Sequence, residues 1–358
     1  MKYNIFPLGN GLRCVHKITD GSVSYIGLAV NAGSRDEGAD SAGLAHFVEH
    51  TIFKGTRHRS AWHISNRMES VGGELNAYTS KEETVIYTAA PSGDPARALD
   101  LIADIVHYSV FPAEGIEREK EVVCEEIKSY LDSPMDSVYD EFEELIYAGS
   151  PMAHNILGTI ESVHTLDSAK CRGFIEDFYT PDNMVLYVAD PSPAARIERL
   201  AEKYFGGLRL HRRASDRTAP PMVAPFREVR ERDGYQAHTL VGARVFDRCD
   251  PRRFPLFLLN NYLGGPCMNS RLNQELRERG YVYTVDSTVA LLSDCGLMQI
   301  YFGSDRKNVE RCLKLVMREL TRLAESPISS VKFDRIRTQY AGQLILAGDN
   351  RESVAMSM

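Results

Sequence analysis

The sequence lacks the features that mark membrane and disulfide-rich proteins. No apolar run reaches the roughly 18 residues that a membrane-spanning helix requires, so no membrane partner is expected. Residues 1–7 hold no apolar signal-peptide core, and we therefore expect the protein in the cytoplasm. The seven cysteines are scattered, odd in number and without a C-x-x-C pair, which favours reduced thiols over a disulfide framework.

An excess of basic residues is also absent. Lys and Arg number 42 against 49 Asp and Glu, and the net charge of −7 disfavours nucleic acid as a partner. A chain of 358 residues predicts two or more domains, and its 43% hydrophobic content is enough for a sizeable core.

The most informative segment is His-Phe-Val-Glu-His at residues 46–50. On a helix, His46 and His50 lie on one face about one turn apart, and Glu49 points to the same side. Two nitrogen ligands with a carboxylate between them suit a hydrolytic zinc site, in which the carboxylate serves as a base for water. The order H-x-x-E-H is the inverzincin signature. The alternative is an ordinary helix with two histidines and a chance glutamate.

The surroundings of this motif favour the metal site. Asp40 or Ser41 is expected to cap the N-terminus of the helix, and Gly55 is expected to stop it. The three ionisable side chains of the motif share one stripe, and burying them is costly unless a metal or hydrogen bonds satisfy them.

A catalytic zinc usually has three protein ligands and one position for water. Residues 114–132 read as a charged helix in which Glu119 and Glu126 are two turns apart on the inward stripe. Glu125 lies about 100° round that helix. We predict Glu126 as the third ligand and Glu119 as a nearby second carboxylate. The alternative is an amphipathic helix with two glutamates that reach out to solvent.

The order of elements predicts an internal repeat. The first copy is expected to contain strands 24–31, 74–79, 84–90 and 184–188, with helices at the metal motif and at 61–71, 95–108 and 114–132. The second copy is expected to contain strands 237–245, 281–291 and 296–302, with helices 254–263, 269–278 and 307–324.

The repeat sets the expected fold and domains. Runs of strands with helices on one face favour an α+β fold of two homologous layered domains. We predict a metal-bearing catalytic repeat at 1–210, a polar, Pro-rich linker at 211–226 and a second repeat at 227–358. Residues 258–262 of the second repeat, Leu-Leu-Asn-Asn-Tyr, stand where the first has H-x-x-E-H, so no metal is expected there. By comparison with the first copy, the second is expected to be incomplete at its C-terminus.

These residues resemble the pitrilysin-like zinc peptidases, the family that includes the mitochondrial processing peptidases and insulin-degrading enzyme. The resemblance rests on the H-x-x-E-H motif, on Glu126 and on the flanking segments 43–56, 72–79 and 155–159. It is greatest to the short bacterial members that resemble processing peptidases. The resemblance implies the fold of the mitochondrial processing peptidase, with two domains that form half of a clamshell.

The resemblance also implies residues that bind substrate. The segment 74–79 is expected at a sheet edge, where an extended substrate adds as a strand beside Asn76 and Ala77. The alternative is a plain hairpin strand after a glycine turn. Arg277 and Tyr283 resemble the family's Arg–Tyr pair, which binds substrate carbonyls.

The spacing of that pair is one residue shorter than in the family. Arg279 and Tyr281 therefore remain alternative candidates, and a solvent-exposed Arg with a packed Tyr is the simpler interpretation.

Together these features predict a zinc-dependent endopeptidase that hydrolyses peptides or unfolded polypeptide segments. One zinc ion per chain, held by the three ligands, is expected to activate a water molecule. Glu49 is the predicted general base, and Glu119 is expected to orient His50 or Glu126. Tyr283, by resemblance, is expected to stabilise the oxyanion.

The clamshell of the family implies a homodimer or a heterodimer that completes it. Two other functions remain open. One is a catalytically silent scaffold subunit that resembles processing peptidases, although an intact H-x-x-E-H with Glu126 argues against it. The other is a binding module with structural zinc, but such sites normally fill all four positions with Cys or His.

Overall fold

The computed structural model describes residues 3–38, 40–208 and 217–358. The chain forms two compact units, the first from residues 1–128, 154–217 and 350–358 and the second from residues 129–153 and 218–349. The predicted boundary at residue 210 and the first part of the predicted linker at 211–226 lie outside the described residues. The predicted split at that linker therefore stays a prediction.

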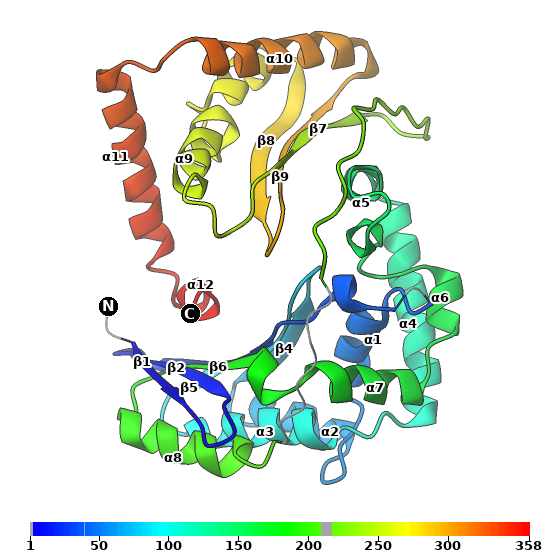
Figure 1. The fold of residues 1–358 in the computed structure, drawn as a ribbon, viewed down its shortest axis with the longest axis vertical. Coiled ribbons are helices and arrows are strands. Elements are labelled where there is room, and N and C mark those ends of the chain that lie inside the picture. Colours follow the sequence, from blue (N-terminus) through cyan, green and yellow to red (C-terminus); the bar gives the residue numbers. More distant parts are fainter. Residues whose placement is uncertain (1–2, 39, 209–216) are drawn as a thin grey trace. The chain divides into compact units, whose positions relative to one another are not determined.

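The first unit is built on a six-stranded sheet in the order β1-β2-β6-β3-β5-β4 (Figure 1). Its strands are β1 (Asn4–Pro7), β2 (Arg13–Ile18), β3 (Val23–Val30), β4 (Glu74–Thr79), β5 (Thr84–Pro91) and β6 (Met184–Asp190). Strands β2 and β6 pair in parallel, and the other neighbours pair antiparallel. The central strands β3 and β6 are rich in apolar and β-branched residues, as expected for strands that are covered on both faces.

Helices cover this sheet. They are α1 (Leu44–Thr51), α2 (Ala61–Glu69), α3 (Pro95–Tyr108), α4 (Ala113–Leu131), α6 (Ile160–His164), α7 (Ser168–Phe178), α8 (Ala194–Phe205) and α12 (Arg351–Met356). Helices α2, α3 and α8 lie along one face of the sheet (Figure 1). Helix α12 lies over the opposite face, where the Tyr187 hydroxyl donates to Met356 Sδ at 3.0 Å.

The core of the first unit lies between the sheet and its helices. Ile26 and Leu28 of β3 and Leu99 of α3 are fully buried there. Phe47 and Val48 of α1 are buried in the same cluster. Burial of one such side chain is worth about 1.5–3 kcal/mol. The apolar side of the helix that carries H-x-x-E-H is therefore anchored in the core.

The second unit contains a three-stranded antiparallel sheet in the order β7-β9-β8. Its strands are β7 (Ala237–Val245), β8 (Val282–Leu291) and β9 (Gly296–Ser304), and its helices are α5 (Pro134–Ile146), α9 (Arg253–Gly264), α10 (Val309–Glu325) and α11 (Ser330–Ala347). Residues 258–262 lie within α9, as predicted. The predicted regular helix at 269–278 is wrong in part, because Asn273–Arg277 forms a short π-helix.

The predicted α+β class is confirmed in both units, since helices pack against mainly antiparallel sheets. Among the described residues, no helix is both long and apolar enough to span a membrane.

Candidate metal centre

Helix α1 begins after Gly43, where the backbone is left-handed and therefore favours glycine. Gly43 has φ 88°, and a Cβ atom there would lie 2.5 Å from the Leu157 carbonyl oxygen. The two oxygens of the Glu37 carboxylate accept hydrogen bonds from the backbone N–H groups of Gly43 and Ala45, both at 2.8 Å. Burial raises the pKa of Glu37 to about 8, and the hydrogen bonds from the two N–H groups oppose that rise.

The sequence-based prediction of an Asp40 or Ser41 cap is therefore wrong. The carboxylate of Glu37 reaches the free N–H groups from a preceding turn, and the longer side chain serves two of them at once.

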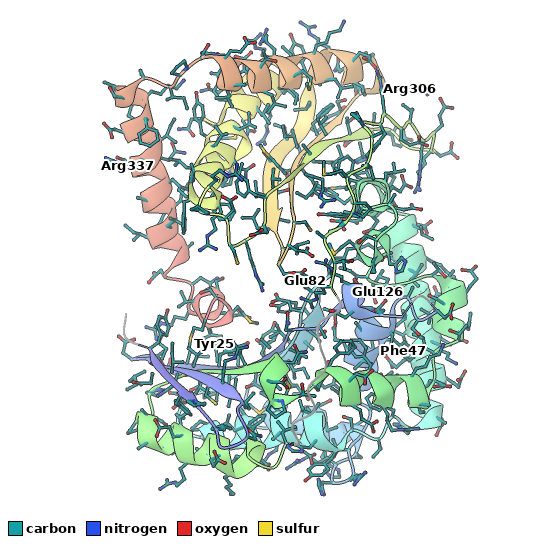
Figure 2. All side chains as sticks on the ribbon, viewed as in Figure 1. Tyr25, Phe47, Glu82, Glu126, Arg306 and Arg337 are labelled. Atoms are coloured by element: carbon teal, nitrogen blue, oxygen red, sulfur yellow. The ribbon has the colours of Figure 1, made fainter. Side chains whose placement is uncertain are left out.

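The two histidines and Glu126 converge in the structure. The His46 and His50 rings lie 4.6 Å apart between centroids. The Nε2 atoms of His46 and His50 are 3.7 and 3.4 Å from Glu126 Oε2. Glu126 of α4 thus lies next to α1, the helix that carries Phe47 (Figure 2). One ligand atom from each of the three residues lies within 4.8 Å of the others.

These separations fit a metal ion better than direct hydrogen bonds. The 3.4 and 3.7 Å distances are long for hydrogen bonds. Bonds of about 2.0–2.2 Å in tetrahedral geometry place ligand atoms about 3.3–3.6 Å apart. Two imidazole nitrogens and one carboxylate oxygen also match the donor set of catalytic zinc sites. The residues present therefore fit a zinc ion.

The protonation of His46 is compatible with metal binding. Burial and the neighbouring charge of His50 lower the pKa of His46 to about 3. The neutral imidazole, which is the form that binds metals, is thus favoured at neutral pH.

Helix α4 supplies Glu126 because its buried stripe faces the core. Val123 and Ile127 are buried, and they fix the rotation of the helix. Glu126 is half-buried on the side of α1, whereas the neighbouring Glu125 is exposed and pairs with Lys128 at 2.6 Å. The structure therefore separates the two adjacent glutamates as the helical geometry predicts.

Glu119 contacts the His50 ring at the nitrogen that does not face Glu126. Its Oε2 is 3.3 Å from His50 Nδ1, and its Oε1 is 2.6 Å from Lys54 Nζ. Of the two predicted targets of Glu119, the structure places His50 in contact with it. Sequence reasoning missed Lys54, which lies in the bend after the end of α1 at Thr51.

Glu49 is held by a neighbour that sequence reasoning also missed. The Thr79 hydroxyl at the end of β4 donates to Glu49 Oε2 at 2.7 Å. Burial raises the pKa of Glu49 above its ordinary value. A carboxyl group with a raised pKa is better matched to general acid–base chemistry near neutral pH. Thr79 lies in the segment 72–79 that contributes to the family resemblance, but the sequence does not show which way its hydroxyl points.

Strand β4 forms an edge of the sheet. Its Asn76 and Ala77 pair with Tyr87 and Ile86 of β5, and among the described strands β4 has no second neighbour. Asn76 is exposed and Ala77 is partly buried. A free edge of this kind can accept an extended peptide as an additional strand.

Arg277 and Tyr283 belong to the second unit, as do Arg279 and Tyr281. Arg277 is exposed at the end of the π-helix, with Nη1 3.2 Å from Met268 Sδ. The exposed Tyr283 donates its hydroxyl to Asp305 Oδ1 at 2.9 Å. The assigned role of this pair toward substrate stays a prediction.

The two alternative residues each have a partner in the second unit. Arg279 Nη2 lies 2.7 Å from Glu275 Oε2, and the guanidinium carbon of Arg311 lies 4.0 Å from the centroid of the Tyr281 ring.

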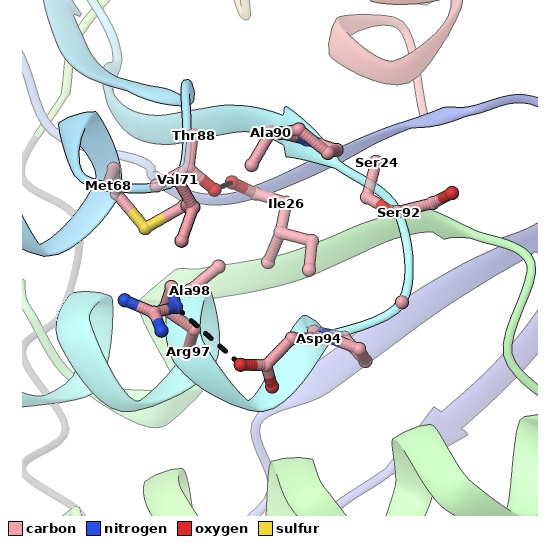
Figure 3. Close-up of a pocket in the computed structure, with 13 residues that line it drawn as sticks. Ser24, Ile26, Met68, Val71, Thr88, Ala90, Ser92, Asp94, Arg97 and Ala98 are labelled. Carbon is pink, nitrogen blue, oxygen red and sulfur yellow. Dashed lines mark hydrogen bonds and ion pairs between the residues drawn. The ribbon is translucent and has the colours of Figure 1, made fainter.

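A separate pocket of about 230 Å³ opens between β3, β5, α2 and α3 (Figure 3). Ile26, Met68 and Ala98 are among its apolar lining, and Arg97 Nε lies 3.5 Å from Asp94 Oδ2 at its rim. The pocket shares no residue with the metal cluster.

The chain is similar in sequence to profiles of peptidase family M16 and to proteins named as uncharacterized zinc proteases. The profile described as insulinase (peptidase family M16) matches residues 14–160, and the profile described as peptidase M16 inactive domain matches residues 165–340. An uncharacterized zinc protease of Bacillus subtilis is 33% identical over 96% of this chain and 84% of its own length. An uncharacterized zinc protease of Streptomyces coelicolor is 35% identical over 95% of this chain and 76% of its own length.

Solved structures share the fold. A protease from Helicobacter pylori superposes with a TM-score of 0.90 at 22% identity, covering 99% of this chain and 87% of its own. A peptidase M16 inactive domain from Pseudomonas fluorescens gives a TM-score of 0.85 at 21% identity, covering 96% of this chain and 84% of its own. Profiles, relatives and fold agree with the resemblance drawn from H-x-x-E-H, and the chain belongs to peptidase family M16.

Proposed function

We propose that this protein is a zinc-dependent endopeptidase that hydrolyses peptides or unfolded polypeptide segments. The observation that carries the proposal is the convergence of His46, His50 and Glu126 on one point, with Glu49 on the same helix. Two relatives that are named as uncharacterized zinc proteases support it.

The chemistry divides between the ion and the chain. Bound zinc would lower the pKa of water and polarise the peptide carbonyl. Glu49 is the base that takes the proton from the attacking water and passes it to the leaving amine. The Thr79 hydroxyl, 2.7 Å from Glu49 Oε2, fixes the direction of that carboxylate before substrate binds.

Strand β4 is the proposed binding site for the substrate backbone. Residues 74–79 present a free edge among the described strands, and the last of them, Thr79, contacts Glu49. A peptide that pairs with β4 would therefore lie beside the base. Recognition through backbone groups gives affinity without selecting particular side chains, which suits a broad range of peptides.

The exposure of the cluster speaks against a closed structural zinc site. His46 is buried, but the Glu126 side chain is 32% exposed and the His50 side chain is 23% exposed. A structural site would normally close its four positions with Cys or His ligands, and no cysteine belongs to the described cluster. We propose one zinc ion per chain, and dimerisation remains a proposal on the family resemblance alone.

The proposal is tested by measuring hydrolysis of fluorescence-quenched peptides that together cover a broad range of sequences. We expect hydrolysis by the purified chain, loss of hydrolysis with a chelator and recovery when zinc is added back. Glu49→Gln should keep its zinc, measured by elemental analysis after dialysis, and lose hydrolysis. Zinc binding without any hydrolysis in the wild type would favour the silent scaffold instead.

A further inference from the structure

Lys54, Glu119 and His50 form a continuous series of polar contacts next to the metal cluster. Lys54 Nζ lies 2.6 Å from Glu119 Oε1, and Glu119 Oε2 lies 3.3 Å from His50 Nδ1. Lys54 is four residues beyond His50, which is itself four residues beyond His46. Helix α1 ends at Thr51 and carries both histidines, and the bend that follows it carries Lys54, the cation that contacts Glu119.

The geometry of Glu119 leaves it one orientation. Its side chain is 11% exposed, so few other partners are available to its two oxygens. With Oε1 engaged by the ammonium group, Oε2 faces the ring of His50. A carboxylate oxygen can only accept a hydrogen bond, so this contact places the ring proton of His50 on Nδ1. The Nε2 atom faces Glu126 Oε2 at 3.4 Å and is the ring atom that would bind the ion.

The aliphatic part of the Lys54 side chain packs against the start of α4. Gly115 lies in the first turn of α4, and a Cβ atom there would lie 3.4 Å from Lys54 Cβ and 3.7 Å from Lys54 Cγ. Both distances are ordinary van der Waals contacts, so the aliphatic stem of Lys54 packs beside the first turn of α4 on its way to Glu119. The Lys54 side chain is 34% exposed, so its charge is partly withdrawn from water.

His46 differs from His50 in what holds its ring in place. Its outer nitrogen, His46 Nδ1, is buried and has no hydrogen-bond partner among the described residues. Packing in the core holds His46, whereas polar contacts hold His50. The two proposed ligands therefore depend on different parts of the structure.

We propose that Lys54 is a positioning residue of the metal centre. It holds Glu119 so that Glu119 accepts the Nδ1–H of His50, which directs Nε2 toward the ion. This inference rests on the proposed function, because the ion is the proposed zinc. It adds a residue outside the H-x-x-E-H motif to the machinery that sets metal affinity.

Zinc affinity of the full chain, measured by competition with a chromogenic chelator, is the first test. We expect Lys54→Met to raise the dissociation constant about tenfold or more, in the range typical for loss of a partner behind a metal ligand. Lys54→Arg keeps the charge and should stay within about threefold of the wild type. Lys128→Met is the matched control, because Lys128 pairs with Glu125 on the exposed side of α4, and it should change nothing.

The tautomer of His50 is the second test, and it needs no zinc. Long-range nitrogen–proton NMR of the zinc-free wild type should show a proton on Nδ1 of His50, and Lys54→Met should show a fraction of rings without a proton there. A merely structural ion pair would lower thermal stability without moving this signal. Combining Lys54→Met with Glu119→Gln should add little to the effect of either change on zinc affinity, because both act through one contact.

The outcomes separate this inference from the proposed function. Unchanged zinc affinity and an unchanged His50 tautomer in Lys54→Met would overturn the role of Lys54 while leaving the zinc site intact. Absence of zinc binding in the wild type would overturn the proposed function. If Lys54→Met does not fold, the wild-type ring decides, and a His50 ring without a proton on Nδ1 overturns the inference.

Discussion

Replacement of Thr79 by Val tests how the proposed base is held. Val keeps the β-branched shape that suits the end of β4, but it removes the hydroxyl that donates to Glu49 Oε2 at 2.7 Å. A hydrogen bond to a charged group is worth about 1.5–3 kcal/mol. If about half of that energy orients Glu49 for reaction, kcat should fall about three- to tenfold, since 1.36 kcal/mol corresponds to a factor of ten in rate.

The assay is peptide hydrolysis at saturating zinc, with KM and zinc content measured in parallel. We expect the loss in kcat, with KM and zinc content close to wild type, because Thr79 contacts the base and none of the proposed ligands. Thr88→Val is the matched control, since Thr88 lies on the adjacent strand and its hydroxyl donates to the Ile26 carbonyl at 3.2 Å. A wild-type kcat in Thr79→Val would refute the idea that this hydroxyl positions Glu49.

Three further predictions concern the surrounding fold. Glu37→Ala leaves two backbone N–H groups at the start of α1 without their acceptor and should lower the free energy of unfolding by about 1–3 kcal/mol in urea titrations. In the native protein a thiol reagent should modify Cys249 fully and Cys267 more slowly, and the five buried cysteines should react only after unfolding. Burial lowers the pKa of His16, so the unfolded chain takes up a proton first as the pH falls below 6.5. Stability should therefore drop as the pH falls below that value, and His16→Gln should remove this component of the acid loss in urea titrations at pH 7 and pH 5.

The parts of the site that follow from helical periodicity could be predicted from the sequence. The spacing of four between His46 and His50, and of seven between Glu119 and Glu126, fixes which side chains share a face whatever the rest of the chain does. The strand at Glu74–Thr79 was also predicted and has the same bounds in the structure, whereas its place at a sheet edge was implied by the family resemblance.

The contacts between distant segments could not be predicted in the same way. Glu37 caps α1 from a preceding turn, and Lys54 contacts Glu119 across 65 positions of sequence. Neither contact follows from a local period, because each depends on how two elements pack. The short strands β1 and β2 were missed for a related reason, since β2 is stabilised by parallel pairing with β6, far along the chain.

The nature of the metal site is tested most directly by X-ray absorption at the zinc edge on the purified chain. We expect one zinc per chain, bound by two imidazole nitrogens and at least one oxygen at about 2.0–2.2 Å, with the spectrum altered in Glu126→Ala. A shell of sulfur ligands at about 2.3 Å, or a spectrum that Glu126→Ala leaves unchanged, would contradict the convergence of His46, His50 and Glu126 on a single ion.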